Sequence, residues 1–241
     1  MNKRILVLGD GLLGTEIVKQ TGWDYISRKK DGIDITNPES YIDLLKNCTH
    51  IVNCIGYTNT KDNIKNKHLE INVRGVYCLA KVCEKLHVKL IHISTDYVYA
   101  NSHQDATEND LPVPLPNWYG HSKVMADTII QTMFPDESEY LILRGTFKST
   151  PYTHERAWYN LVGNFDYIDV IASLMIKLID NDACGLYNVG TEQKNLYDLA
   201  KRTKPDVQMD GGDYSTNKYH RPYYTTMDLT KMKRFLDGLK K

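Results

Sequence analysis

The chain has 241 residues, of which 41% are apolar, so it is long and hydrophobic enough for one large domain or for a domain with an attached lobe. Its 30 basic and 30 acidic residues cancel, which excludes the long-range field that gathers nucleic acids or anionic membranes. No segment approaches the roughly 18 apolar residues of a membrane span, so we expect no membrane partner.

The five cysteines are odd in number and include no Cys-x-x-Cys pair. This usage predicts reduced thiols in a cytoplasmic protein. Three histidines considered as ligands, His92, His121 and His154, share no helical spacing with Cys, Asp or Glu that suggests a metal site, so we expect none.

Buried strands and amphipathic helices alternate along the first part of the chain. The apolar run from Ile5 to Leu8 predicts a strand buried on both faces, and a helix over 12–20 follows it. Further predicted strands cover 24–27, 51–55, 88–94 and 140–144, and further predicted helices cover 39–46, 63–86 and 119–133. This alternation predicts an α/β fold with a doubly wound parallel sheet, a Rossmann-like core over residues 1–144.

After Arg144 the rhythm loosens, and residues 145–165 show the composition of a loop. The remaining predicted elements are a helix over 167–179 capped by Asp166, a strand over 185–189, a helix over 196–203, an irregular stretch over 204–225 and a last helix capped by Asp228 and ending near Leu236. We expect 145–241 to form mostly a smaller substrate-binding lobe, with 166–190 a candidate to return to the core sheet.

A glycine turn separates the first strand from the first helix. The spacing of Gly9, Gly11 and Gly14 is that of a dinucleotide-binding fingerprint. The first glycine permits the tight turn, the second lets the backbone approach the pyrophosphate, and the third lets the helix pack on the strand. The amides near Leu12 and Leu13 then face the phosphates. The alternative is an ordinary tight turn.

The end of the second strand usually reads the 2′ position of the cofactor ribose. Here Ser27 and Arg28 open a basic run, and no acid appears before Asp31. Arginine grips a phosphate through two parallel hydrogen bonds, so we favour NADPH as the cofactor. NADH is the alternative if these are only solvated turn charges.

Three side chains suggest a carbonyl reductase. The spacing Tyr-x-x-x-Lys occurs six times in this chain, so it means little alone. Only Tyr119 and Lys123 also follow a glycine turn and a Ser-Thr strand end, at Thr95. Residues four apart share one helix face, and ligands of open α/β sheets bind at the carboxyl ends of the strands.

These residue types suit proton transfer to a ketone. We expect Tyr119 to donate a proton to the alkoxide that forms as hydride arrives, and Thr95 to bond the same oxygen. A nearby ammonium lowers the pKa of a phenol, so we expect Lys123 to tune Tyr119 in this way and to hold the nicotinamide ribose. The alternatives are a core tyrosine and a surface lysine.

These residues resemble the extended short-chain dehydrogenase/reductase family, and within it the dTDP-4-dehydrorhamnose reductase-like group. The similar stretches are 52–59, 71–76, 92–99, 108–110 and 119–123, with weaker ones at Arg144, 166–170, 187–190 and Arg221-Pro222. The resemblance implies reduction of the 4-keto group of a nucleotide-linked 6-deoxyhexose with NADPH or NADH. It also implies a homodimer, for which the apolar stripe on helix 63–86 is a candidate face.

The resemblance assigns further residues to the cofactor. It implies that Asp34 and Ile35 lie by the adenine and that Asn72 supports the site from its helix. It also implies that three consecutive residues line the cofactor, namely Cys54, Ile55 and Gly56.

Candidate substrate contacts are Thr58, Asp96, Tyr97 and Arg144. For Asp96 and Tyr97, a structural role in the turn after the strand is an equal alternative. Paired hydrogen bonds make arginines suited to a diphosphate, and the candidates are Arg144, Arg156 and Arg221.

The chain departs from the family pattern in three places. Gly9 and Gly11 are two residues apart, where the family commonly has three, and the segment after Arg144 is shorter. Tyr97 stands where related dehydratases carry a glutamate, which disfavours elimination of water. The alternatives to reduction are epimerisation of a sugar nucleotide on the same site and a non-catalytic, dinucleotide-binding regulatory subunit.

Overall fold

A six-stranded sheet, parallel throughout, forms the centre of the chain, and its strand order is β10-β5-β4-β3-β1-β2. The structure is a computed structural model that describes residues 3–60, 64–211 and 223–239. The strands of this sheet are β1 (Ile5–Leu8), β2 (Asp24–Ile26), β3 (His50–Asn53), β4 (Lys89–Ile93), β5 (Tyr140–Arg144) and β10 (Gly185–Asn188). The predicted fold class is confirmed.

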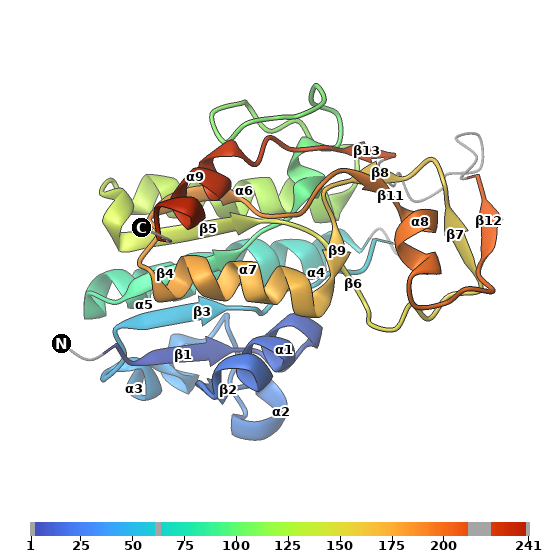
Figure 1. Ribbon diagram of the computed structural model, residues 1–241. Helices are drawn as coiled ribbons and strands as arrows, with labels where there is room; N and C mark the ends of the chain where they lie inside the picture. The colour runs from blue at the N-terminus through green and yellow to red at the C-terminus, as the bar shows by residue number, and fades with distance from the viewer. Residues whose placement is uncertain (1–2, 61–63, 212–222, 240–241) are drawn as a thin grey trace.

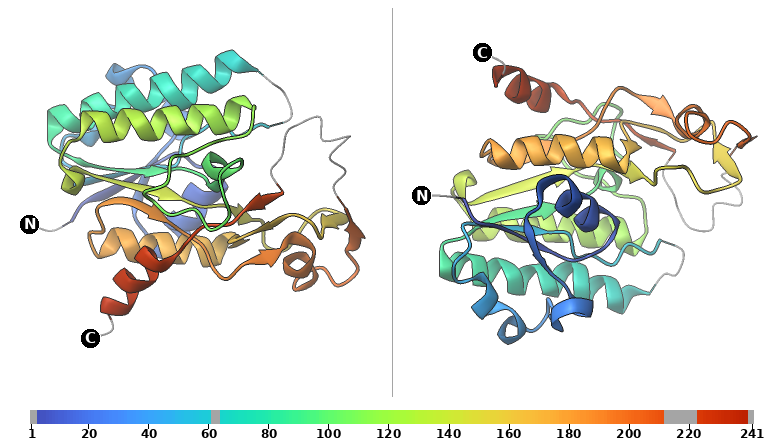
Figure 2. Two further views of the ribbon diagram at one scale, coloured as in Figure 1. Left: turned by 90° about the horizontal axis from the view of Figure 1, so that it is seen from above. Right: turned by 60° about the horizontal axis from the view of Figure 1, so that its bottom comes forward.

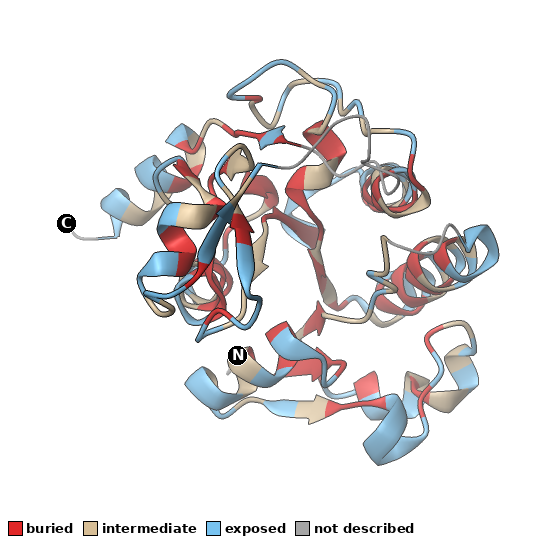
Figure 3. Ribbon diagram, turned by 90° about the vertical axis from the view of Figure 1, so that its right-hand side faces the viewer, coloured by how far each residue is buried: buried red, intermediate tan, exposed pale blue. Residues whose placement is uncertain are grey.

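Alternation along the strands sends side chains into two cores, one on each face of the sheet. In β1, Val7 packs into one core and Leu8 into the other. The helices α1 (Leu12–Thr21), α7 (Ile168–Asp180) and α9 (Thr230–Gly238) cover the first face, while α5 (Val76–Leu86) and α6 (Trp118–Met133) cover the second (Figures 1 and 2). The buried strands run between these layers (Figure 3).

The strand order reverses at β1, because β2 lies on one side of it and β3 on the other. Ligands of doubly wound sheets bind in the crevice at such a reversal, outside the carboxyl ends of the strands. The short elements between β2 and β3 are α2 (Arg28–Asp31), η1 (Pro38–Ser40) and α3 (Ile42–Leu45). The glycine turn after β1 and the loop after β3 therefore flank the crevice.

Two predicted helices differ in detail. The helix predicted over 39–46 is broken into η1 and α3, because Tyr41 leaves the helical region to bury its ring and donate its hydroxyl to the Ile35 carbonyl. The helix predicted over 63–86 starts outside the described residues at Asn63, and consists of α4 (Lys65–Lys67), the π-helical segment η2 (His68–Gly75) and α5. Such wide turns occur often at functional sites.

The stretch predicted as a loop, 145–165, contains three short strands, β6 (Phe147–Lys148), β7 (Arg156–Trp158) and β8 (Val162–Gly163). Their partners are β9 (Asp166–Tyr167), β12 (Gln208–Asp210), β11 (Lys194–Asn195) and β13 (Tyr224–Thr225). Strands of two or three residues show no readable periodicity, which explains why the prediction failed. These strands and α8 (Leu196–Lys201) form a unit that we call the small lobe, and its buried residues make a third apolar cluster.

Two predicted helix caps behave differently. Asp166 lies in β9, where its carboxylate accepts the Tyr167 amide and pairs with Lys194 at 3.0 Å, so it does not cap α7. Asp228 does accept the amide of Thr230, the first residue of α9, at 2.6 Å. The remaining turns of helix are η3 (Asp96–Tyr99) and η4 (Glu137–Glu139). Among the described residues, none of the helices combines the length and apolarity that crossing a membrane requires.

The glycine turn brings α1 against β1. Gly9 has a φ of +101°, a backbone conformation that favours glycine. A Cβ on Gly14 would lie 2.1 Å from the Gly9 carbonyl oxygen, whereas a Cβ on Gly11 would meet nothing within 4 Å. Gly14 is therefore required for packing, and Gly11 leaves open space at the start of the helix.

We expect Gly14→Ala to destabilise the fold by about 2–4 kcal/mol, because overpacking forces the backbone of the turn to move. Gly11→Ala is the matched control, and we expect its free energy of unfolding to stay within about 1 kcal/mol of the parent. Urea denaturation of the two variants measures both values. Equal stability of the two variants would contradict the packing role of Gly14.

Candidate active site

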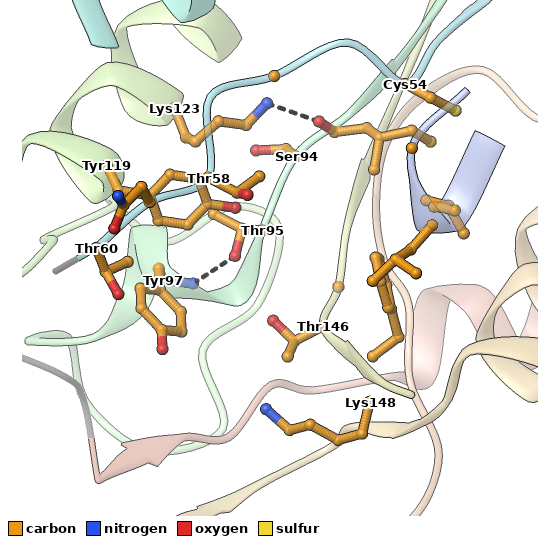
Figure 4. A pocket seen from close by; sticks show the side chains of 18 of the residues that line it. Cys54, Thr58, Thr60, Ser94, Thr95, Tyr97, Tyr119, Lys123, Thr146 and Lys148 are labelled. Carbon is orange, nitrogen blue, oxygen red and sulfur yellow. Dashed lines mark hydrogen bonds between the residues drawn. The ribbon is translucent and has the colours of Figure 1, made fainter. Parts of the chain in front are cut away.

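A cavity of about 1200 Å³ lies at the carboxyl edge of the sheet, between the glycine turn, the loop after β3 and the small lobe. Figure 4 shows its interior. From the core, the predicted site residues that line it are Gly11, Leu12, Leu13, Cys54, Ile55, Gly56, Thr58, Thr95, Tyr97, Tyr119 and Lys123. The core sheet thus brings most of the predicted cofactor residues and all three predicted catalytic residues to one cavity.

The loop after β3 presents small and apolar groups to the cavity. Burial raises the pKa of the Cys54 thiol to about 12, so this cysteine is a neutral lining group and no nucleophile. Asn72, from η2, supports the loop from behind. Its carboxamide oxygen accepts the Tyr57 amide at 2.7 Å, and its nitrogen donates to the Tyr57 carbonyl and to the Ser122 hydroxyl, both at 2.9 Å.

Thr95 and Tyr119 are in direct contact. The Thr95 side chain accepts the Tyr97 amide at 3.3 Å as the cap of η3, and its hydroxyl donates to the Asp96 carboxylate at 3.1 Å. The Thr95 hydroxyl also acts on the neighbouring Tyr119 phenol and lowers its pKa, although burial raises it more. The ring of Tyr97 stands edge-on to that of Tyr119, with 5.6 Å between centroids. The phenol is therefore held at the wall of the cavity.

The amine of Lys123 is buried beneath this pair. Its Nζ donates to the Ile93 carbonyl at 2.6 Å and lies 2.8 Å from Nε2 of His92 (Figure 4 shows the first bond). Burial lowers the pKa of Lys123 to about 8, although the Asp127 carboxylate opposes the shift. The amine is thus easily deprotonated for a lysine.

The expected lowering of the Tyr119 pKa by Lys123 is wrong for this structure. Burial raises the pKa of Tyr119 to about 12, and the Thr95 hydroxyl opposes the shift only in part. Lys123 does not contribute because its amine is engaged with the Ile93 carbonyl and His92. The phenol consequently stays protonated at neutral pH, which is the form that donates a proton.

Sequence reasoning missed the role of His92 and treated it as a residue packed on its strand. The Asn53 carboxamide oxygen accepts the Ile55 amide, so its nitrogen faces Nδ1 of His92 at 3.2 Å. Burial, and to a lesser degree the Lys123 charge, lower the pKa of His92 well below its usual range, so the buried ring is neutral and meets Asn53 and Lys123 through its two nitrogens.

Two predicted substrate contacts lie in the core instead. The Arg144 guanidinium is buried, donates from Nε to Asp127 at 2.9 Å and also contacts the Tyr99 hydroxyl. Asp96 is 2% exposed, and hydroxyls from Thr95, Thr146 and Thr225 surround its carboxylate. The alternative of a structural role in the turn therefore applies to Asp96, and Arg144 is a structural arginine.

The predicted adenine-side residues lie outside the lining of this cavity. Ser27 is fully buried and caps α2, whose first residue is Arg28. Asp34 accepts hydrogen bonds from Thr36, and Ile35 is buried in the core. Burial leaves Ile35 little surface for an adenine contact, so the structure gives it a packing role.

The small lobe supplies lining residues that the sequence pattern only hinted at. They include Lys148, Tyr152, His154, Arg156 and Trp158. Trp158 stacks on Tyr223 with 5.7 Å between ring centroids. Basic and aromatic residues in a nominal loop are a signal for a ligand-binding segment, although their convergence depends on tertiary pairing. Arg221 lies outside the described residues.

Residues 3–149 match the model of the RmlD substrate binding domain family. The match covers more than half of the sequence. The chain belongs to this family.

Related proteins agree with this membership. A dTDP-4-dehydrorhamnose reductase of Mycobacterium tuberculosis is 26% identical over 148 residues, which are 56% of this chain and 48% of that protein, so the matched region spans about half of the relative. A dTDP-4-keto-6-deoxy-D-glucose reductase of Streptomyces niveus is 26% identical over 234 residues, covering 84% of this chain and 78% of the relative. The crystal structure of a dTDP-4-dehydrorhamnose reductase from Bacillus anthracis in complex with NADP has a TM-score of 0.81 and 21% identity, over 98% of this chain and 92% of that one.

We expect Lys123→Met to be more stable than the parent at pH 7, by about 1–3 kcal/mol, because it removes a buried charge. Below pH 8 the folded parent must bury an ammonium. Between about pH 8 and 10.5 only the unfolded chain keeps the proton, so the stability of the parent rises with pH through this window. Urea denaturation at pH 7 and pH 9.5 should therefore show the difference shrinking. A constant difference would contradict the shifted pKa.

Proposed function

We propose that this protein reduces the 4-keto group of a nucleotide-linked 6-deoxyhexose with a nicotinamide dinucleotide. The observation that carries the proposal is that Thr95, Tyr119 and Lys123 line the same cavity as the glycine turn. The names of the relatives support the substrate class.

The residues present fit a dinucleotide. The turn at Gly11 leaves open space beside the first amides of α1, as an approaching pyrophosphate requires. Cys54, Ile55 and Gly56 offer a smooth wall along the crevice. When bound, the cofactor supplies the hydride.

The chain itself supplies the proton. Tyr119 is protonated at neutral pH and donates to the oxygen that gains charge, while Thr95 fixes the position of that oxygen. Lys123 and His92 form a buried polar contact behind the phenol, which positions the helix that carries it. This arrangement suits reduction, since the acid is present in its protonated form.

The small lobe supplies groups for the nucleotide. Lys148 and Arg156 offer positive charge for a diphosphate, and Trp158 offers an aromatic face for a base or sugar. The reductase thus takes its cofactor on the core and its substrate between core and lobe.

We expect Tyr119→Phe to lower turnover by at least about 10²-fold, because it removes a positioned proton donor, and to leave cofactor affinity unchanged. The assay follows absorbance at 340 nm with dTDP-, UDP- and GDP-linked 4-keto-6-deoxyhexoses. Tyr77→Phe, which removes a hydroxyl from an exposed residue of α5 outside the cavity lining, is the matched control. Full turnover by Tyr119→Phe would exclude this mechanism, and the absence of oxidation with every sugar would exclude the proposed function.

Two arginine variants distinguish a residue of the cavity lining from a residue of the core. We expect Arg156→Met to raise the KM for the sugar nucleotide by about tenfold with unchanged stability, because it removes one exposed charge from the cavity. Arg144→Met should instead destabilise the fold by about 3–5 kcal/mol, since it leaves the Asp127 carboxylate buried without its partner. Thermal denaturation and steady-state kinetics distinguish these effects. Equal stability of the two variants would contradict the core position of Arg144.

A further inference from the structure

The carboxylate of Asp10 lies at the end of β2, although the sequence itself has no acidic residue between that strand and Asp31. The Gly9 amide donates to the Ile26 carbonyl at 2.9 Å, which holds the glycine turn against the end of the strand. Asp10, the single residue between Gly9 and Gly11, reaches across. Its carboxylate accepts the hydroxyl of Ser27, the residue after β2, at 2.9 Å.

The contact places a negative charge at this point of the fold. Ser27 is fully buried, while Asp10 is exposed, so the carboxylate lies at the surface above the serine. The hydroxyl of Ser27 also accepts the Lys30 amide at 3.1 Å, and the Ser27 amide donates to the Asp31 carboxylate at 2.9 Å. Ser27 is therefore fixed by three contacts and holds Asp10 in one position.

Of the neighbouring cations, Lys30 is directed away from Asp10. Lys30 donates to the Tyr25 carbonyl and lies over the Tyr25 ring, back along the strand. The pKa of Asp34 is lowered by hydrogen bonds from Thr36 and, to a smaller extent, by the Arg28 guanidinium. Lys29 is exposed on the one-turn helix α2.

We propose that Asp10, fixed by Ser27, reads the 2′ position of the cofactor ribose and makes the protein prefer NADH to NADPH. The inference rests on the proposed function and reverses the preference predicted from Arg28. An acid at the end of the second strand accepts a hydrogen bond from a ribose hydroxyl and repels a 2′-phosphate. In this chain the acid comes from the shortened glycine turn, so a search along β2 alone does not find it.

The test is isothermal titration calorimetry of the full chain with NADH and with NADPH, without any sugar. We expect the parent to bind NADH at least about tenfold more tightly, as repulsion between one carboxylate and a phosphate a few ångströms away predicts. We expect Asp10→Asn to tighten NADPH binding by about tenfold and to change NADH binding by less than about threefold. Higher salt should reduce the parent's preference.

Asp24→Asn is the matched control, because it removes the same charge from the exposed start of β2 and should leave the preference unchanged. Tighter binding of NADPH by the parent would overturn the inference and leave the proposed reductase standing. An unchanged preference in Asp10→Asn would overturn the role of Asp10. Failure to bind either dinucleotide would remove the proposed function together with the inference.

Discussion

The buried carboxylate of Asp96 ties the end of β4, beside the cavity, to the segment after β5 and to β13 of the small lobe. It accepts hydroxyl hydrogen bonds from Thr95 at the end of β4, Thr146 after β5 and Thr225 in β13. A carboxylate at 2% exposure is stable only when hydrogen bonds replace its water, and here three hydroxyls do so. Because the same network orients the Thr95 hydroxyl, the position of this candidate site residue depends on how the small lobe is joined to the sheet.

The buried amine of Lys123, beneath the candidate site, lowers the stability of the folded chain. Lys123 is buried against a carbonyl and a neutral imidazole, without a carboxylate in hydrogen-bond contact among its described partners. Burying a cation in this way is unfavourable, and its lowered pKa reflects that. The same burial raises the pKa of the Tyr119 phenol. Two titratable groups whose pKa values are shifted in opposite directions in one cleft mark a candidate functional site.

Long periodic elements and short motifs were predictable, while contacts between distant segments were not. The six core strands, α6 and the meeting of Thr95 with Tyr119 follow from buried runs and from the rule that strand ends share an edge. The lobe strands were missed because two or three residues carry no period. Arg144 was misplaced because a guanidinium suits either a diphosphate or a buried acid, and only the fold shows that Asp127 lies beside it.

The two halves of the candidate site are held in place by different interactions. The cofactor half depends on backbone geometry, such as the close approach of Gly14 to the Gly9 carbonyl, which a motif records directly. The substrate half depends on Lys148, Arg156 and Trp158, which are carried by strands too short to hold their places alone. Their arrangement follows from pairing with β9 and β12 and from the Asp96 network. The proposed cofactor half can thus be recognised from sequence motifs, whereas the proposed substrate half becomes visible only in the fold.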